Sequence, residues 1–207
     1  MIRRTKEAFY DIAQFPNVVG AVDGTLIPII SPSRDEHVYV CRKGYHAINV
    51  QGVVDAEMRF TNAVAKWPGS VHDSFIWTNS TLCRRVERGE VDGWLLGDSG
   101  YPLRPWLLTP VLNPSTAGQH NYNHAHIKTR NVIERPFGLC KSRFRHHKSS
   151  YAFTNINNLI CNSIHQLQAI GTVDLNVIRT TEILKMVMPS YAIYTESTMM
   201  DRPPETI

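Results

Sequence analysis

The sequence predicts a layered α/β or α+β domain, because strand patterns come first along the chain and helical patterns lie between and after them. Four short runs are apolar and bounded by turn residues, as strands are: VVGAVDG (18–24), YHAINVQGVVD (45–55), RFTNAVAKW (59–67) and GWLLGDSGY (93–101). The clearest helical pattern spans 124–147, where Ile133, Phe137, Cys140 and Phe144 recur at spacings of four, three and four residues.

The N-terminal region predicts a helix followed by a buried strand. Residues 5–15 have the composition of a short helix. The apolar run 18–24 that follows reads as a strand, and we expect it to end in a turn at Asp23 and Gly24, since Asp-Gly pairs are common in turns.

The next region predicts a β-hairpin and then a helix. The runs 45–55 and 59–67 are expected to pair as two strands joined through the polar stretch between them. Ser70 or Asp73 could cap a helix that runs towards Gly89.

The rest of the chain predicts one more strand and two helices. The strand at 93–101 is expected to end at Asp98. Residues 102–123 are rich in Pro, Asn and Thr, so we expect mostly loop with a short element around 103–108. A second helical pattern lies at 155–170, and the polar, Pro-containing tail after about residue 190 is expected to be disordered.

The composition excludes several classes of protein. The 207 residues are 43% hydrophobic with 12 Gly and 12 Pro, which is typical of a globular domain. No apolar run reaches transmembrane length, and the N-terminus MIRRTKEAFY lacks the apolar core of a secretory signal. The four cysteines form no CxxC pair, so a zinc knuckle or redox motif is not expected. We expect a reducing compartment, the cytosol or the nucleus.

Positive charge is concentrated in residues 128–148. The chain carries 22 Lys+Arg and 18 Asp+Glu, but seven of the basic residues and one acid, Glu134, fall in this segment, so elsewhere acidic residues outnumber basic ones by 17 to 15. Such a segment is typical of a surface that faces phosphate, and a solvated helix face is an equally good alternative.

Four carboxylates have settings that suit a functional site. Asp23 and Asp98 each end an apolar strand, where ligand sites gather in α/β sheets, and Glu134 lies on the basic helix. Asp73, in PGSVHDS, is the fourth candidate. Simpler alternatives exist, because Asp-Gly and Asp-Ser-Gly are common turns and Asp73 could be a helix cap.

Several carboxylates beside a basic helix suit phosphodiester chemistry. Carboxylate oxygens are preferred ligands of Mg²⁺ and Mn²⁺, and two such ions about 3.5–4 Å apart can activate the attacking oxygen and stabilise the leaving one. Clustered carboxylates repel one another, so a metal would offset the repulsion. Nearby Lys and Arg would hold the nucleic-acid backbone.

Six motifs occur in the order found in one known family. They are GAVDGT, RKGYHAINVQGVVD, WPGSVHDS, WLLGDSGY, NYN and RNVIERPFGLCKSRFR. Over roughly residues 9–170 the chain resembles the DDE transposase domain of the PIF/Harbinger superfamily, which includes the domesticated Harbinger transposase-derived nuclease. The resemblance implies an α/β, RNase H-like fold, in which a mixed sheet is flanked by helices on both sides.

The resemblance also implies a site and a reaction. The family's DDE triad falls on Asp23, Asp98 and Glu134, with 35 residues between the last two. Asp73 matches a further acidic position that is treated as a metal ligand in the family's nuclease members. These residues imply a DNA endonuclease or strand-transfer enzyme that depends on a divalent metal, Mg²⁺ or Mn²⁺.

The basic helix supplies the candidate DNA-binding residues. Arg130 and Lys141 lie one turn before and two turns after Glu134, on roughly the same side, and could clamp phosphates next to the metals. The other candidates on this helix are Arg135, Arg143 and Arg145. Lys43 and His46, in RKGYH, are weaker candidates, for which a surface hairpin is at least as good an explanation.

By the same resemblance, the chain divides into a helical lead-in (1–15), a DDE nuclease domain (16–171) and a partly disordered C-terminal extension (172–207). Complete transposases of this group carry a DNA-binding module before the catalytic domain, whereas GAVDGT begins here at residue 20. We therefore expect either a fragment or a chain that works with a separate DNA-binding partner. The family implies a Myb-like partner that helps nuclear entry, and a nuclear location with some cytoplasmic protein and no membrane.

Pro136 is the local exception in the basic helix. In a helix interior, proline removes one hydrogen bond and clashes with the carbonyl of Val132, at a cost of about 3 kcal/mol or more. The helix is expected either to kink or to begin anew at Pro136, which would leave Glu134 on a loop. Pro136 and the missing module also favour an alternative function, a catalytically inactive domesticated or truncated transposase that binds nuclear DNA or a partner.

Overall fold

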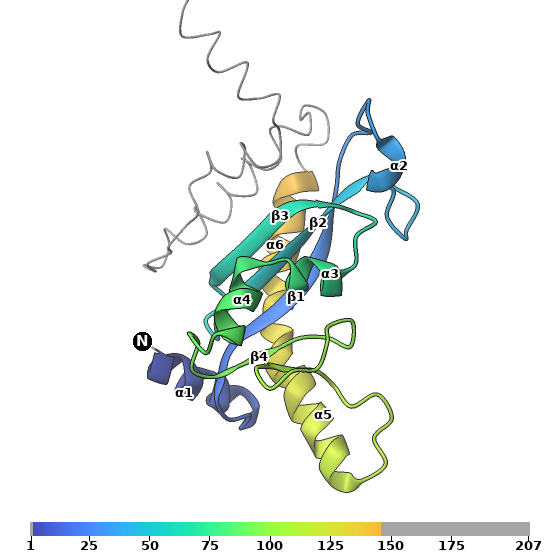
Figure 1. Ribbon diagram of the computed structural model, residues 1–207. Coiled ribbons are helices and arrows are strands. Elements are labelled where there is room, and N and C mark those ends of the chain that lie inside the picture. Colours follow the sequence, from blue (N-terminus) through green and yellow to red (C-terminus); the bar gives the residue numbers. More distant parts are fainter. Residues whose placement is uncertain (1, 146–207) are drawn as a thin grey trace, which may run out of the picture. The chain divides into compact units, whose positions relative to one another are not determined.

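The computed structural model describes residues 2–145, with side chains as far as Ser142 (Figure 1). Residue 1 and residues 146–207 lie outside the described part. The helix expected at 155–170, the C-terminal extension and the domain boundary at residue 171 therefore stay predictions.

Five strands form one mixed sheet in the order β3-β2-β1-β4-β5. The strands are β1 (Val18–Pro28), β2 (Ala47–Val54), β3 (Phe60–Pro68), β4 (Trp94–Leu96) and β5 (Leu107–Leu108). β1 pairs antiparallel with β2, and β2 with β3, whereas β4 runs parallel to β1 and β5 parallel to β4. This arrangement confirms the expected α/β class and the RNase H-like mixed sheet.

Helices cover both faces of the sheet (Figure 1). They are α1 (Ile2–Ala13), α2 (Glu36–Tyr39), α3 (Asp73–Thr78), α4 (Thr81–Glu87), α5 (Ala117–Arg130), the 3-10 helix η1 (Asn131–Ile133) and α6 (Glu134–Arg145). α6 lies on one face, and α3 and α4 lie on the other. Within residues 2–145, no helix has the length and apolar character needed to cross a bilayer.

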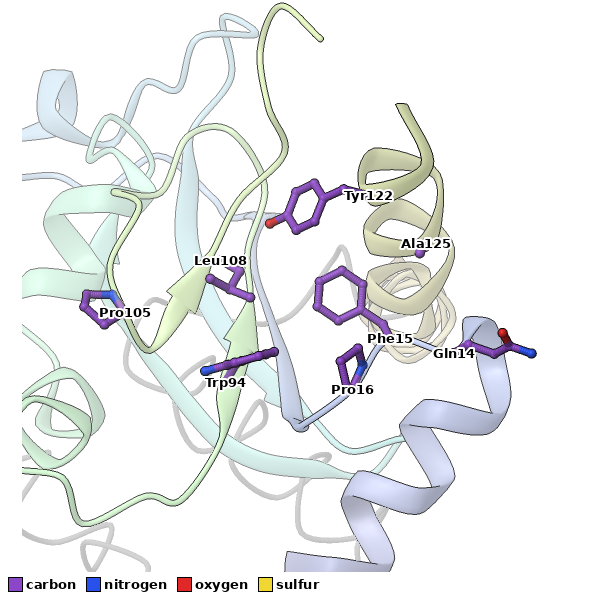
Figure 2. Close-up of a pocket in the computed structure, with 8 residues that line it drawn as sticks. All are labelled: Gln14, Phe15, Pro16, Trp94, Pro105, Leu108, Tyr122 and Ala125. Atoms are coloured by element: carbon purple, nitrogen blue, oxygen red, sulfur yellow. The ribbon is translucent and has the colours of Figure 1, made fainter. Parts of the chain in front are cut away.

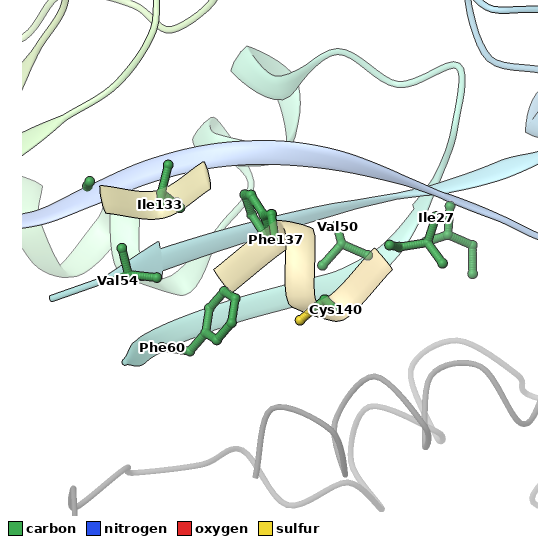
Figure 3. Close-up of a cluster of buried hydrophobic side chains, with 9 residues drawn as sticks. Ile27, Val50, Val54, Phe60, Ile133, Phe137 and Cys140 are labelled. Carbon is green, nitrogen blue, oxygen red and sulfur yellow. The ribbon is translucent and has the colours of Figure 1, made fainter. Parts of the chain in front are cut away.

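Hydrophobic clusters hold the sheet between these helices. Successive residues of a strand point to opposite faces, so Ala21 of β1 packs on the α6 side while Val22 packs on the side of α3 and α4. The cluster under α6 contains Ile27, Val50, Val54, Phe60, Ile133, Phe137 and Cys140 (Figure 3). The ring of Phe137 fills the space over Gly52, where an added Cβ would come within 3.1 Å of it.

The first strand continues past its predicted end. β1 runs on to Pro28 with Asp23 opposite Gly52 of β2, so the expected turn at Asp23 and Gly24 was wrong. Continuous pairing with β2 outweighs the turn tendency of a single Asp-Gly pair. The hairpin of β2 and β3 is confirmed.

The helix expected to run towards Gly89 is split in two. α3 ends at Thr78, and the side chain of Ser80 accepts the N–H of Cys83 and so caps α4. A serine in this position stops one helix and starts the next, because its hydroxyl replaces a backbone partner.

The basic helix begins earlier than predicted and is interrupted. Residues 117–123, expected as loop, form the first half of α5, because Thr116 and Gln119 make a capping box. The chain then tightens into η1, where the N–H of Glu134 donates to the carbonyl of Asn131. Pro136 falls in the first turn of α6, where a missing N–H costs little. The predicted break is therefore present, but Glu134 is the first residue of α6 and does not lie on a loop.

Phe137→Ala is expected to lower the free energy of unfolding by about 3–5 kcal/mol, because its ring is only 6% exposed in the α6 cluster. Leu139→Ala, on the same helix, is the matched control, since that side chain is 49% exposed and its loss should change the value by less than about 0.5 kcal/mol. Urea unfolding followed by circular dichroism measures both. Equal losses would contradict the packing of α6 on the sheet.

Candidate active site

Three aspartates from different elements come together where β1 and β4 lie side by side. In this parallel pair Ala21 lies beside Leu96, and Asp23 and Asp98 each follow two residues later. Asp73, the first residue of α3, places its carboxylate over Gly24, where an added Cβ would meet Asp73 Oδ1. Glycine at this position leaves the room that Asp73 occupies.

Asp23 is held by hydrogen bonds to both of its oxygens. The N–H of Gly24 donates to Oδ1 (2.7 Å), and Arg130, at the end of α5, donates from Nη1 to Oδ2 (2.8 Å). The two side chains are 20% and 15% exposed, so this ion pair is largely shielded from water. Nη2 of Arg130 lies 3.9 Å from Glu134 Oε1. Arg130 therefore lies between two members of the predicted triad.

Asp73 and Asp98 are each oriented through one oxygen. Asn49 Nδ2 donates to Asp73 Oδ1 (2.8 Å) and to the carbonyl of Val71 (2.9 Å), and the N–H of Gly100 donates to Asp98 Oδ1 (2.9 Å). The Oδ2 atoms of both aspartates accept no hydrogen bond from the described residues. Each carboxylate thus has one fixed oxygen and one that is open to a ligand.

The phenol of Tyr101 is buried and is influenced by the charges of all three aspartates. Burial raises the pKa of Tyr101 well above its usual value, and the charges of Asp73, Asp23 and Asp98 raise it further. The hydroxyl donates to Gln51 Oε1 (3.4 Å) in the interior. Tyr101 therefore stays protonated and acts as a neutral hydrogen-bond donor.

The surroundings of the aspartates disfavour their negative charge. Burial is the main reason that the pKa of Asp23 is raised; Arg130 and the N–H of Gly24 oppose it, and repulsion from Asp98 and Asp73 adds to it. Burial also raises the pKa of Asp73, with repulsion from Asp98 opposed by the hydrogen bond from Asn49. A cation among these oxygens would offset both effects, so the donor set fits a hard divalent ion.

Glu134 is the most open member of the predicted set. Its side chain is 64% exposed and approaches Asp23 only through Arg130. Within residues 2–145, no three Asp, Glu, His or Cys side chains converge as a ready-made metal site. Arg130 would have to leave the space between Asp23 and Glu134 before both could hold one ion.

Comparison with known protein families identifies the family to which this domain belongs. The family model described as DDE superfamily endonuclease matches residues 22–167, well over half of the chain. The chain belongs to the DDE superfamily endonucleases. All four predicted carboxylates of this endonuclease domain fall inside the matched range, and members of the superfamily generally use divalent metals.

The endonuclease domain is similar to curated proteins of animals and plants. It is 40% identical to "Putative nuclease HARBI1" of Homo sapiens over 145 residues, which cover 70% of this chain and 42% of that protein. It is 33% identical to "Protein ALP1-like" of Arabidopsis thaliana over 159 residues, covering 68% and 39%. The chain thus spans about two fifths of the length of these relatives, and no solved structure matches it significantly. The expected resemblance to Harbinger-derived nucleases is confirmed.

The predicted DNA-binding arginines of the endonuclease domain have different surroundings. Arg130 is bound to Asp23, whereas Arg135 is exposed at the start of α6. Arg143 and Arg145 lie near the end of α6, but their side chains lie outside the described part. Phosphate contacts by these arginines stay predictions.

Two lysines from distant segments lie close to the site. Burial lowers the pKa of Lys141, the charge of Lys43 lowers it further, and the charge of Asp23 opposes both. The charges of Lys43 and Asp23 thus both act on Lys141. His46, from the same motif as Lys43, lies 2.8 Å from Glu36 Oε1 through its Nε2.

Sequence reasoning missed the residues that hold the aspartates in place. Every position of β2 is buried, so Asn49 and Gln51 are polar side chains in a fully buried strand. Buried polar groups need partners, and this signal could have identified both residues as part of a polar site. The pair of Asp23 and Arg130 spans 107 positions, and no local pattern could have predicted it.

A separate pocket lies between the α1–β1 connection, the β4–β5 edge and α5 (Figure 2). Its volume is about 480 Å³, and its lining residues are Gln14, Phe15, Pro16, Trp94, Pro105, Leu108, Tyr122 and Ala125. The lining is almost entirely apolar and includes none of the predicted site residues. This pocket therefore lacks the groups that phosphodiester chemistry needs.

Arg130→Ala is expected to lower the free energy of unfolding at pH 7 by roughly 2–3 kcal/mol in metal-free buffer, because it leaves the shielded Asp23 carboxylate unpaired. The pKa of Asp23 is raised in the fold and would rise further without Arg130. The loss should therefore be small below the ordinary pKa of 3.8, where Asp23 is protonated in both states, and grow as the pH rises through the folded-state value.

Urea unfolding in EDTA at pH 7 and near pH 3.5 measures this effect. Arg135→Ala is the control, because Arg135 is exposed, and it should change stability by less than about 0.5 kcal/mol at either pH. A loss for Arg130→Ala that is equal at the two pH values, or larger in acid, would refute the role of the ion pair.

Gly24→Ala is expected to displace the Asp73 carboxylate without unfolding the domain, because the new Cβ meets the end of a side chain that can rotate. Loss of the Asn49 hydrogen bond should lower the free energy of unfolding by about 1–3 kcal/mol. Gly24→Ala and Asp73→Ala should weaken Mn²⁺ binding by similar factors in calorimetric titration. Gly138→Ala, whose Cβ would meet nothing within 4 Å, should bind Mn²⁺ as the wild type does. Unchanged binding by Gly24→Ala, with loss in Asp73→Ala, would contradict the contact.

Proposed function

We propose that this domain is a divalent-metal-dependent DNA endonuclease that cleaves phosphodiester bonds, with Mg²⁺ or Mn²⁺ as its metal. The observation that carries the proposal is that Asp23, Asp73 and Asp98 come from three separate segments and lie near enough for their charges to interact, each carboxylate being oriented by its own hydrogen bond. Three acidic groups in a half-buried position repel one another, so the arrangement is costly unless it serves to bind a cation.

Asp23, Asp73, Asp98 and Glu134 are the residues that would hold the metal. The open Oδ2 atoms of Asp73 and Asp98 are ready to act as ligands, whereas Asp23 and Glu134 share the guanidinium of Arg130. When bound, a divalent ion supplies an activated attacking oxygen and stabilises the leaving oxygen of the phosphodiester.

The remaining residues orient the carboxylates and neutralise the substrate. Asn49 fixes the rotamer of Asp73, and the N–H of Gly100 fixes that of Asp98. Arg130 favours the ionised form of Asp23 and, if a metal displaced it, its guanidinium could bind a phosphate of the substrate. Lys43 and Lys141 bring positive charge to the edge of the carboxylates.

DNA is the proposed substrate because the basic groups at this edge match a phosphate backbone. Backbone contacts position a nucleic acid but carry little sequence information. Target choice would therefore come from elsewhere, and a Myb-like DNA-binding partner together with a nuclear location completes the proposal. Co-precipitation of the chain with such a partner from nuclear extract tests this part.

A second candidate is a DNA-binding protein without catalysis. The specific observation in its favour is Arg130, which already neutralises Asp23 and separates it from Glu134. If Arg130 stays in this position on DNA, the domain would use its basic residues for binding alone. Salt-sensitive DNA binding without cleavage in any divalent metal would favour this candidate.

Asp98→Asn is expected to reduce nicking of supercoiled DNA by at least about 100-fold. Removing a residue that only supports a metal ligand already lowers metal affinity or activity by about 10–100-fold, and Asp98 is proposed as a direct ligand. The change keeps the shape of the side chain and removes its charge. Nicking is followed by gel electrophoresis in Mg²⁺, in Mn²⁺ and in EDTA.

Asp92→Asn is the control for this experiment. Asp92 is 82% exposed and pairs with Lys6, so its substitution should leave nicking unchanged. Equal cleavage by the wild type and Asp98→Asn, or undiminished cleavage in EDTA, would disprove the assignment.

A further inference from the structure

A pair of aromatic rings lies beside the aspartates and outside the core. Trp67, near the end of β3, and Phe75, in α3, meet edge to face with their ring centroids 5.1 Å apart. Phe75 is 50% exposed, and neither ring belongs to the three buried clusters of the described residues. A single exposed aromatic side chain is common on protein surfaces and does not by itself indicate a binding site. The evidence for a site is the position of Phe75 relative to Asp73.

The position of the pair is fixed relative to Asp73. Trp67 is the partner of Asn49 in the register of β2 and β3. The side chain of Asn49 donates to Asp73 Oδ1, and Phe75 follows Asp73 by two residues in the same helical turn. The aromatic pair and the carboxylate are therefore both held next to one residue, Asn49.

Positive charge lies beside the rings. Lys66 Nζ lies 5.2 Å from the ring centroid of Trp67. Trp67 Nε1 is shielded from water and is therefore not open to a ligand in this state. A cation beside an exposed aromatic ring suits a nucleotide, which offers a negative phosphate and a flat base.

We propose that Phe75, supported by Trp67 and Lys66, stacks on an unpaired base of the DNA strand next to the phosphate to be cut. The substrate class is then DNA with at least one unstacked nucleotide at the cleavage site. A base inside an intact duplex is covered on both faces by its neighbours, so Phe75 could not reach it. The inference rests on the proposed function for the place of the phosphate, but stacking does not itself require cleavage.

The experiment uses the whole chain and two DNA duplexes of the same sequence. One is fully paired, and the other carries a single unpaired 2-aminopurine. Fluorescence anisotropy measures binding and quenching of 2-aminopurine measures stacking, in EDTA and again in Ca²⁺. The wild type should bind the unpaired DNA more tightly and quench it. Phe75→Ala should lose about tenfold in affinity for the unpaired DNA alone, together with the quenching.

Two further variants separate stacking from packing. Phe75→Leu keeps apolar bulk without a flat ring and should behave like Phe75→Ala, whereas Phe75→Tyr should behave like the wild type. Tyr10→Ala is the matched control, because it removes an aromatic ring that is 48% exposed on α1.

Three results would overturn the inference. These are wild-type behaviour of Phe75→Ala, an equal loss on paired and unpaired DNA, and a wild type that binds neither DNA. Cleavage in Mn²⁺ is scored separately. A wild type that stacks the base but cuts no DNA would remove the proposed function and leave this inference standing.

Discussion

The fixed position of Asp23 is the constraint on which the rest of the site depends. Its strand is the centre of the sheet, with Asp23 opposite Gly52 of β2 and Ala21 opposite Leu96 of β4. The carboxylate cannot move away with a loop, so the other groups are brought to it. Asp98 follows β4 by two residues, Asp73 occupies the space over Gly24, and Arg130 reaches Asp23 from the end of α5. The site is therefore built around a residue of the central strand.

Arg130 would compete with a bound metal ion for the carboxylate of Asp23. Buried carboxylates need positive charge nearby, and in this state the guanidinium supplies it to Asp23 from within the chain. A divalent ion that uses both Asp23 and Glu134 must first displace that guanidinium. Part of the binding free energy of the ion is then used to break an existing pair, which lowers its apparent affinity.

Local sequence patterns correctly predicted the helices and strands that depend mainly on nearby residues. The hairpin of β2 and β3 and the helical face of Ile133, Phe137 and Cys140 follow from periodicity, and both are present. The end of β1 was wrong because the Asp-Gly pair indicates a turn only when no partner strand continues beside it. Residues 117–123 of α5 were missed because their composition resembles a loop, although Thr116 and Gln119 carried the capping signal.

The order of six motifs pointed to Asp23, Asp73, Asp98 and Glu134, and their role as metal ligands stays a prediction. In the structure Asp73 lies against Gly24, next to Asp23, while Glu134 is exposed. The contacts of Arg130 and Asn49 with these acids depend on how distant segments pack, which no short pattern encodes. The same limit applies to the charge interaction of Lys43 with Lys141, which lie 98 positions apart.

The break before Pro136 has a consequence for Glu134 that an unbroken helix would not offer. Because α6 begins at Glu134, this carboxylate lies at the amino end of a new helix, where aligned peptide dipoles present partial positive charge. That field stabilises a negative side chain by about 0.3–1 kcal/mol. The backbone stays helical through η1 and the N–H of Glu134 already donates to the carbonyl of Asn131, so the effect on this exposed side chain is small. The position before Pro136 thus adds a weak source of charge stabilisation that does not depend on Arg130.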